Sequence, residues 1–112
     1  MTDGTQRYWF QYFPNNFMWS QGMMIAIEMA RWGGSSMSEV DRVGQRLKDK
    51  VGDNEAWGVE WEREAQRIEK MGDEAAGESH HFTAASHYLR AATYYFVGER
   101  FVRPGAKKTG LY

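Results

Sequence analysis

Apolar residues recur at helical spacing along most of the chain. The segment from Trp19 to Trp32 is apolar on almost every side before Gly33-Gly34 ends it, so this helix must be covered on more than one side. No segment shows sustained alternation with a period of two, and the stretch from Tyr8 to Phe13 is the only plausible strand. The pattern therefore predicts an all-α protein of four to five helices arranged in antiparallel helical hairpins.

The second predicted helix follows Ser36. Ser36 and Glu39 have the spacing of a capping box, in which each side chain accepts a hydrogen bond from the backbone N–H of the other residue. Apolar residues from Val40 to Val51 then recur on one side only, and Gly52 follows them. We expect this helix to bury one face and to expose the other.

A third helix is predicted to begin at Asp53 or Asn54, either of which can act as its N-cap. Trp57 and Trp61 begin its apolar stripe. Its wet face is predicted to carry two ion pairs, Glu60 with Arg63 and Glu64 with Arg67. Most of the charged residues of the chain lie between positions 39 and 78, so we expect the middle of the chain to face solvent.

The fourth predicted helix runs from about Ser79 to Val97 and carries two apolar stripes. The stripes are Phe82, Ala85, Leu89, Ala92 and Phe96 on one side, and Ala84, Tyr88, Ala91 and Tyr95 beside it. Such a helix is predicted to be buried between layers. Arg103-Pro104 indicates the start of a fifth helix, so we interpret the chain as truncated at its C-terminal end. The predicted organisation is an aromatic arm over residues 1–18 and a helical domain over residues 19–112.

The charge and composition of the chain exclude several classes of function. Lys and Arg number 14 against 15 Asp and Glu, and this balance argues against nucleic acid or an acidic membrane as a partner. The absence of cysteine excludes disulfides, thiolate zinc sites and thiol nucleophiles. No apolar stretch reaches the roughly 18 residues of a bilayer span, and the N-terminus lacks the features of a secretory signal. We therefore expect a cytoplasmic protein, and no motif implies a cofactor.

Motifs for catalysis and for metal binding are missing from the sequence. The nearest approach to Gly-x-Ser-x-Gly is Gly33-Gly34-Ser35-Ser36, which is better explained as the end of one helix and the cap of the next. The histidines, which are His80, His81 and His87, do not have the spacing of ligands that converge on one metal ion. We expect no catalytic residue and no metal ligand, and therefore no hydrolytic turnover by this chain alone.

A small-molecule pocket is predicted against the N-terminal half of the chain, where large apolar side chains surround one polar residue, Glu28. Glu28 either forms a buried ion pair, for example with Arg31, or points into a substrate cavity. The fourth helix would add His87 and Tyr95 as hydrogen-bonding groups. The predicted substrate-binding residues are Phe17, Met18, Trp19, Met23, Glu28, His87 and Tyr95. The alternative is that each of them is a packing residue.

Four motifs resemble the N-terminal helical region of a group of α/β-hydrolases. They are Tyr12-Phe13-x-x-Asn16-Phe17-Met18-Trp19, Gly33-Gly34, Asn54-x-x-Trp57-x-x-x-Trp61 and Ala85-x-x-x-Leu89-Arg90-Ala91-Ala92-x-Tyr94-Tyr95. The group includes dihydroxypseudooxynicotine hydrolase, fungal polyketide-shortening hydrolases and esterases of the fermentation-respiration-switch type. The resemblance implies a helical cap, or lid, over an α/β-hydrolase core that supplies the Ser, Asp and His. The implied reaction cleaves an ester or carbon–carbon bond of a bulky carbonyl substrate.

Alternatives from a different class remain open. The helix pair from Trp57 to Tyr95 also resembles a tetratricopeptide-type protein-binding module, although only one unit is visible and stability usually needs about three. A free-standing helical dimerisation protein is the other alternative. The expected partners are therefore an α/β-hydrolase catalytic core on the same or a separate chain, a small-molecule carbonyl substrate, and further copies of this chain in a homo-oligomer.

Overall fold

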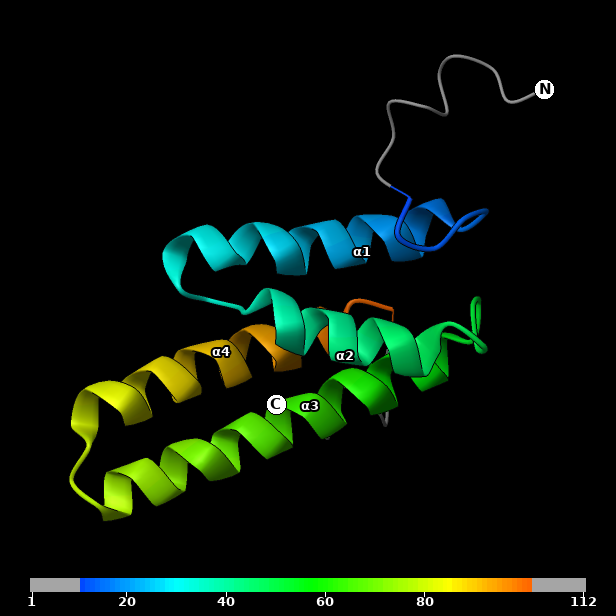
Figure 1. The fold of residues 1–112 in the computed structure, drawn as a ribbon. Helices are drawn as coiled ribbons and strands as arrows, with labels where there is room; N and C mark the ends of the chain where they lie inside the picture. The colour runs from blue at the N-terminus through cyan, green and yellow to red at the C-terminus, as the bar shows by residue number, and fades with distance from the viewer. Residues whose placement is uncertain (1–10, 102–112) are drawn as a thin grey trace.

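The computed structural model describes residues 11–101, which form four α-helices and one short 3₁₀ helix (Figure 1). The elements are α1 (Phe17–Glu28), η2 (Met29–Trp32), α2 (Met37–Leu47), α3 (Asn54–Gly77) and α4 (His81–Glu99). No strand occurs within this range, so the all-α prediction is confirmed. The predicted fifth helix and the first three residues of the predicted strand lie outside the described residues.

Helices α3 and α4 form one long antiparallel hairpin, and α1 and α2 cover only the end of it that lies opposite its tip (Figure 1). α3 packs along α4, α2 packs on α3, and α1 contacts both α2 and α4. The turn at the hairpin tip includes Ser79, whose φ of 64° lies in the left-handed region. Because α1 and α2 cover only the other end of the hairpin, the tip projects beyond the four-helix part of the fold, as the left side of Figure 1 shows.

The core lies where the four helices meet, and aromatic rings fill much of it. The ring centroids of Trp19 and Trp57 are 5.0 Å apart, and those of Trp57 and Trp61 are 5.8 Å apart. Phe13 packs edge-on against Trp19 at 5.2 Å. All four side chains are buried, so the described end of the aromatic arm is packed on the core.

Side-chain caps fix where α1 and α3 begin. The Asn16 side chain accepts a hydrogen bond of 2.9 Å from the backbone N–H of Trp19. The Asp53 side chain accepts one of 3.1 Å from the backbone N–H of Ala56, which confirms the expected cap of α3. Each cap satisfies a backbone donor that has no partner within its own helix.

The capping box predicted for α2 is wrong. The Ser36 side chain makes no hydrogen bond that caps the helix. The Tyr94 hydroxyl lies between the Ser36 backbone N–H and the Glu39 carboxylate, which were expected to bond directly to each other. This hydroxyl accepts a hydrogen bond of 3.0 Å from the Ser36 backbone N–H and donates one of 2.5 Å to Glu39. A residue of α4 thus completes the start of α2, because Glu39 turns toward α4 instead of toward the helix end.

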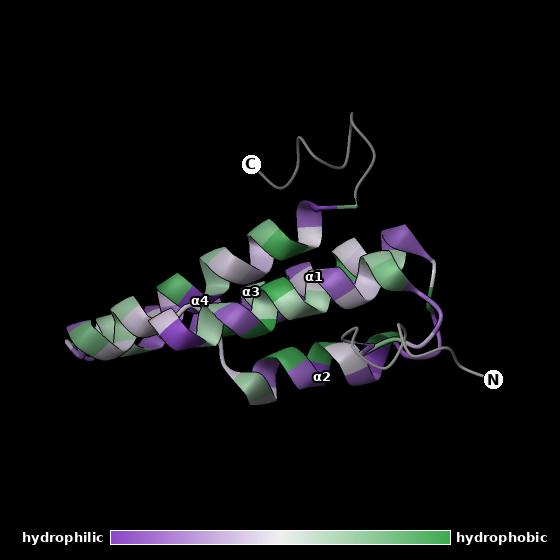
Figure 2. Ribbon diagram, turned by 90° about the horizontal axis from the view of Figure 1, so that it is seen from above, coloured by the Kyte–Doolittle hydropathy of each residue, from purple (hydrophilic) through white to green (hydrophobic). Residues whose placement is uncertain are grey.

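The prediction that α4 is buried between layers is also wrong. Ala84, Ala91 and Tyr94 are buried on the side that faces the rest of the fold. The first predicted stripe is exposed along its whole length within the described part of the chain; it consists of Phe82, Ala85, Leu89, Ala92 and Phe96. Figure 2 shows hydrophobic residues at intervals along α4, between pale and hydrophilic ones. The helix therefore has a buried face and an apolar exposed face.

Candidate functional site

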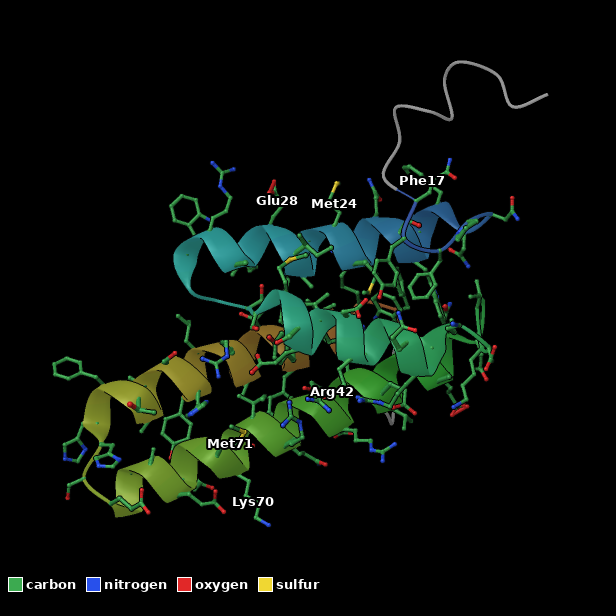
Figure 3. The ribbon with its side chains drawn as sticks, viewed as in Figure 1. Phe17, Met24, Glu28, Arg42, Lys70 and Met71 are labelled. Atoms are coloured by element: carbon green, nitrogen blue, oxygen red, sulfur yellow. The ribbon has the colours of Figure 1, made fainter. Side chains whose placement is uncertain are left out.

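The outer side of α1 carries three of the seven predicted substrate-binding residues. These three are Phe17, Met18 and Glu28, of which Phe17 and Met18 are about half exposed. Met24, which was not predicted, is also exposed and lies two turns after Phe17. Figure 3 shows Phe17, Met24 and Glu28 on one side of α1, pointing away from the other helices. We call Phe17, Met18, Met24 and Glu28 the outer face of α1. This face combines apolar bulk with a single carboxylate.

Glu28 is not buried, contrary to the expectation. Its side chain is 60% exposed, and it forms an ion pair of 4.0 Å with Arg31. The expected partner is therefore present, whereas the expected burial is wrong. The physical reason is that Met23 and Ala26 occupy the buried side of the helix, so that the apolar neighbours of Glu28 in the sequence do not surround it in space.

Two other predicted residues of α1 face the core. Trp19 and Met23 are fully buried, and the Trp19 indole donates a hydrogen bond of 2.8 Å to the Asn54 side chain. These residues lie on the opposite side of α1 from Phe17 and Glu28. The structure does not bring the two sets together.

The two predicted residues of α4 are engaged by neighbouring side chains. His87 lies 2.7 Å from the Arg90 guanidinium through its Nδ1. Tyr95 donates a hydrogen bond of 2.7 Å to Glu69. The seven residues therefore do not line one cavity among residues 11–101, and their role in substrate binding stays a prediction.

A charged groove of about 450 Å³ lies along α2 and α3. It is lined by Arg42, Arg46, Arg63, Glu64, Gln66, Arg67 and Lys70. Figure 3 shows Arg42 projecting from α2 and Lys70 from α3. Five of the lining side chains are cationic, and none of the seven is an aliphatic or aromatic residue of the kind that lines a pocket for a bulky carbonyl compound.

Glu64 lines this charged groove and is 1% exposed. It is held by Arg67 at 2.7 Å, by Arg46 at 3.2 Å and by Arg42 at 3.6 Å. The predicted pair of Glu64 with Arg67 is present, but the carboxylate is buried and not on a wet face. A buried carboxylate needs several such partners to offset its lost hydration.

Glu60 repeats this arrangement one turn earlier in α3. It is buried and is paired with Arg46 at 2.6 Å, with Arg63 at 3.7 Å and with Lys50 at 3.8 Å. The sequence contained a signal that Glu60 and Glu64 are buried. Glu60 and Glu64 alternate with Trp61 and Ala65 along the same side of α3, at positions that belong to the buried stripe.

A second buried polar cluster joins α2 to α4. Glu39 accepts hydrogen bonds from the Tyr94 hydroxyl at 2.5 Å and from Arg90 at 2.9 Å. Burial, together with the hydrogen bond to Glu39, raises the pKa of Tyr94 above its ordinary value. Sequence reasoning missed this cluster because its members lie more than 50 positions apart and Glu39 had a local explanation.

The described residues contain no group of three or more His, Asp or Glu side chains that could hold a metal ion. Within residues 11–101, no helix has the length and apolar character that a bilayer span requires. The outer face of α1 offers hydrophobic contact and one exposed carboxylate, and α2 and α3 form a cationic groove.

Three fungal proteins are similar to most of the chain. "Alpha/beta hydrolase pydG" of an Acremonium species is 36% identical over 86 residues, which cover 72% of this chain and 20% of that protein. "Alpha/beta hydrolase xenA" of Xenoacremonium sinensis is 34% identical and "Alpha/beta hydrolase gkaG" of Penicillium citrinum is 33% identical, over 70% and 71% of this chain and again 20% of each relative. No family model and no solved structure matches the chain. Over most of its length the chain is therefore homologous to fungal alpha/beta hydrolases, and it spans about a fifth of their length.

Proposed function

We propose that this chain acts as the helical cap of an α/β-hydrolase and forms one wall of the substrate cavity over the catalytic core. The similarity to a fifth of the length of three alpha/beta hydrolases is the observation that carries the proposal. An α/β-hydrolase holds its nucleophile on a turn between a strand and a helix. The described residues are helical and have no strand, so the Ser, Asp and His would come from a core outside this part of the molecule.

The outer face of α1 is the wall that we assign to the substrate. Its exposed Phe17, Met18 and Met24 offer apolar contact for a bulky carbonyl compound, and Glu28 offers one hydrogen-bonding group. A cap of this kind excludes water and holds the substrate over the nucleophile. The resemblance to carbon–carbon hydrolases and esterases supports cleavage of an ester or carbon–carbon bond.

A chimera tests the cap function. The matched segment of alpha/beta hydrolase pydG is replaced by the corresponding residues of this chain, and hydrolysis of p-nitrophenyl esters is measured. We expect the chimera to be active, and both the same hydrolase without this segment and the 112-residue chain alone to be inactive. A truncated hydrolase as active as the chimera would contradict the proposal.

Exposed positions of the active chimera then test the assigned wall. Phe17→Ala, Met18→Ala and Glu28→Gln should each lower kcat/KM by roughly tenfold, which corresponds to about 1.4 kcal/mol, with little change in melting temperature. Val59→Ala on α3 is the matched control, because Val59 is similarly exposed and lies outside this face. Normal kinetics in all three variants would place the cavity wall elsewhere. Trp19 and Met23 are unsuitable because both are fully buried, so their substitution is expected to lower the stability of the fold as well.

A further inference from the structure

The exposed stripe of α4 is an uncharged surface that runs along most of the helix. Phe82 is 95% exposed, Leu89 49% and Phe96 56%, and Ala85 and Ala92 between them are exposed as well. These five residues, which we call the α4 stripe, extend from Phe82 to Phe96, a separation of 14 residues or about 21 Å of helix. From Phe82 to Gly98 the only Asp, Glu, Lys or Arg is Arg90, and its guanidinium is bound to Glu39. A surface of this kind indicates a contact site.

The spacing of the α4 stripe identifies the shape of its partner. Its members follow one another at intervals of three, four, three and four residues. This is the spacing of the seam along which two helices pack with side chains interlocked. The face that would cover the stripe is therefore another helix.

The order of side chains along the stripe is the same from either end. It reads large, small, large, small, large: Phe82, Ala85, Leu89, Ala92 and Phe96. An identical stripe laid antiparallel to it about Leu89 sets Phe82 opposite Phe96 of the second copy, Leu89 opposite Leu89, and each alanine opposite an alanine. A contact between two copies about a twofold axis requires such a self-complementary surface.

We infer that the α4 stripe pairs with the α4 stripe of a second copy of this chain, so that two chains form an antiparallel dimer centred near Leu89. The inference rests on the surface of α4 and not on the proposed cap function, which uses the outer face of α1. The contact is short, since about 21 Å of one helix covers less surface than a standard interface. The dimer is therefore expected to dissociate on dilution.

Single-cysteine variants test both the contact and its direction, because the chain has no cysteine of its own. Leu89→Cys should form a disulfide-linked dimer on oxidation. Phe82→Cys and Phe96→Cys should each crosslink slowly alone and much faster when mixed. In the antiparallel arrangement two copies of one end position lie about 21 Å apart, well beyond the roughly 4.4–6.8 Å between Cα atoms that a disulfide spans.

Met24→Cys is the matched control, because Met24 is similarly exposed but lies on α1. Equal crosslinking of Met24→Cys and Leu89→Cys would overturn the inference, and so would Phe82→Cys that crosslinks faster alone than with Phe96→Cys. Sedimentation of the unmodified chain gives an independent measurement. We expect a monomer–dimer equilibrium that Leu89→Glu abolishes and Met24→Glu leaves unchanged. A monomer over a hundredfold range of concentration would also overturn it.

Discussion

The tyrosines among residues 11–101 share one arrangement, in which each hydroxyl donates a hydrogen bond to a carboxylate from another part of the chain. The pairs are Tyr12 with Asp41, Tyr88 with Asp73, Tyr94 with Glu39, and Tyr95 with Glu69. A carboxylate stabilises the neutral hydroxyl, and burial disfavours the tyrosinate, so both effects raise the pKa. These pairs link the helices through polar contacts as well as through the aromatic core.

The raised pKa values predict a loss of stability at alkaline pH. Burial and the bond to Glu69 raise the pKa of Tyr95 from 10 to about 12. Because the pKa is higher in the folded state, the stabilisation is complete below pH 10 and is lost as the pH rises through about 12. We expect the melting temperature to fall across this range while tyrosinate absorbance at 295 nm increases. Tyr95→Phe should weaken the pH dependence.

Tyr94→Phe should lower the free energy of unfolding at neutral pH by about 2 kcal/mol, since it leaves Ser36 N–H and buried Glu39 each without one partner. Tyr88→Phe is the control. Tyr88 also binds a carboxylate, Asp73, but it lies at the surface, so its loss should cost less than about 0.5 kcal/mol. Urea denaturation measures both, and equal effects would contradict the importance of the buried cluster.

At this scale the sequence predicts residues better where their neighbours are local. The Asp53 cap and the pair of Glu64 with Arg67 involve residues three positions apart, and both are present. The exposure of Glu28 could not be predicted, because it depends on which side of α1 meets the core. The hydrogen bonds of Tyr94 could not be predicted either, because they join α4 to α2 across more than 50 positions.

At the scale of helices, the stabilities of two variants compare the cap of α3, which has a side-chain hydrogen bond, with that of α2, which has none. Asp53→Ala should destabilise the protein by about 1 kcal/mol, because it removes a side-chain hydrogen bond to the first turn of α3. Ser36→Ala should cost much less, since its hydroxyl does not cap α2. Thermal melts of the two variants decide the question. A cost for Ser36→Ala as large as that for Asp53→Ala would restore the capping box.

The contact between α3 and α4 depends on a close approach at Gly98. A Cβ atom at this position would lie 2.8 Å from the Cβ of Trp61, which is fixed to the backbone and cannot rotate away. Gly98→Ala should therefore cost about 1–3 kcal/mol. Gly77→Ala, at the end of α3, meets nothing within 4 Å and should be neutral or slightly stabilising. Equal stabilities of the two variants would show that the helices can separate without cost.

Helix positions were largely predictable, but the environment of each helix was not. The ends at Gly33-Gly34 and the start of α3 follow from local chemistry. The two apolar stripes of α4 were visible in the sequence, yet periodicity does not tell which molecule covers a stripe. One stripe faces the fold of this chain, and the other faces outward.

At the scale of the whole molecule, stability is unevenly distributed along the hairpin. Every member of the core cluster lies outside the segment between Ile68 and Ala91. Within that segment the two helices pack through small residues, such as Gly72 against the Tyr88 ring. Only one such hairpin, α3 with α4, occurs among the described residues, and its tip projects away from the other helices. This arrangement gives no support to a stack of tetratricopeptide-type repeats within that part of the chain.

Hydrogen exchange should reveal this difference. We expect backbone amides in residues 70–90 to exchange at least about tenfold faster than those in residues 57–68, because the distal half can open without disrupting the tryptophan core. Mass spectrometry of proteolytic peptides at low protein concentration measures both segments in one experiment. Uniform protection along α3 would contradict it.

The position of Trp57 has a consequence for how this unit can be carried by a larger protein. Its ring lies 6.5 Å from that of Phe13 and 5.0 Å from that of Phe101, so the first and last described parts of the chain meet on one side chain. A segment whose two ends lie together can be inserted into a host polypeptide without stretching the host at the junction. Residues 11–101 thus have the geometry of a transplantable insert, with both connections at one end and the free hairpin tip at the other.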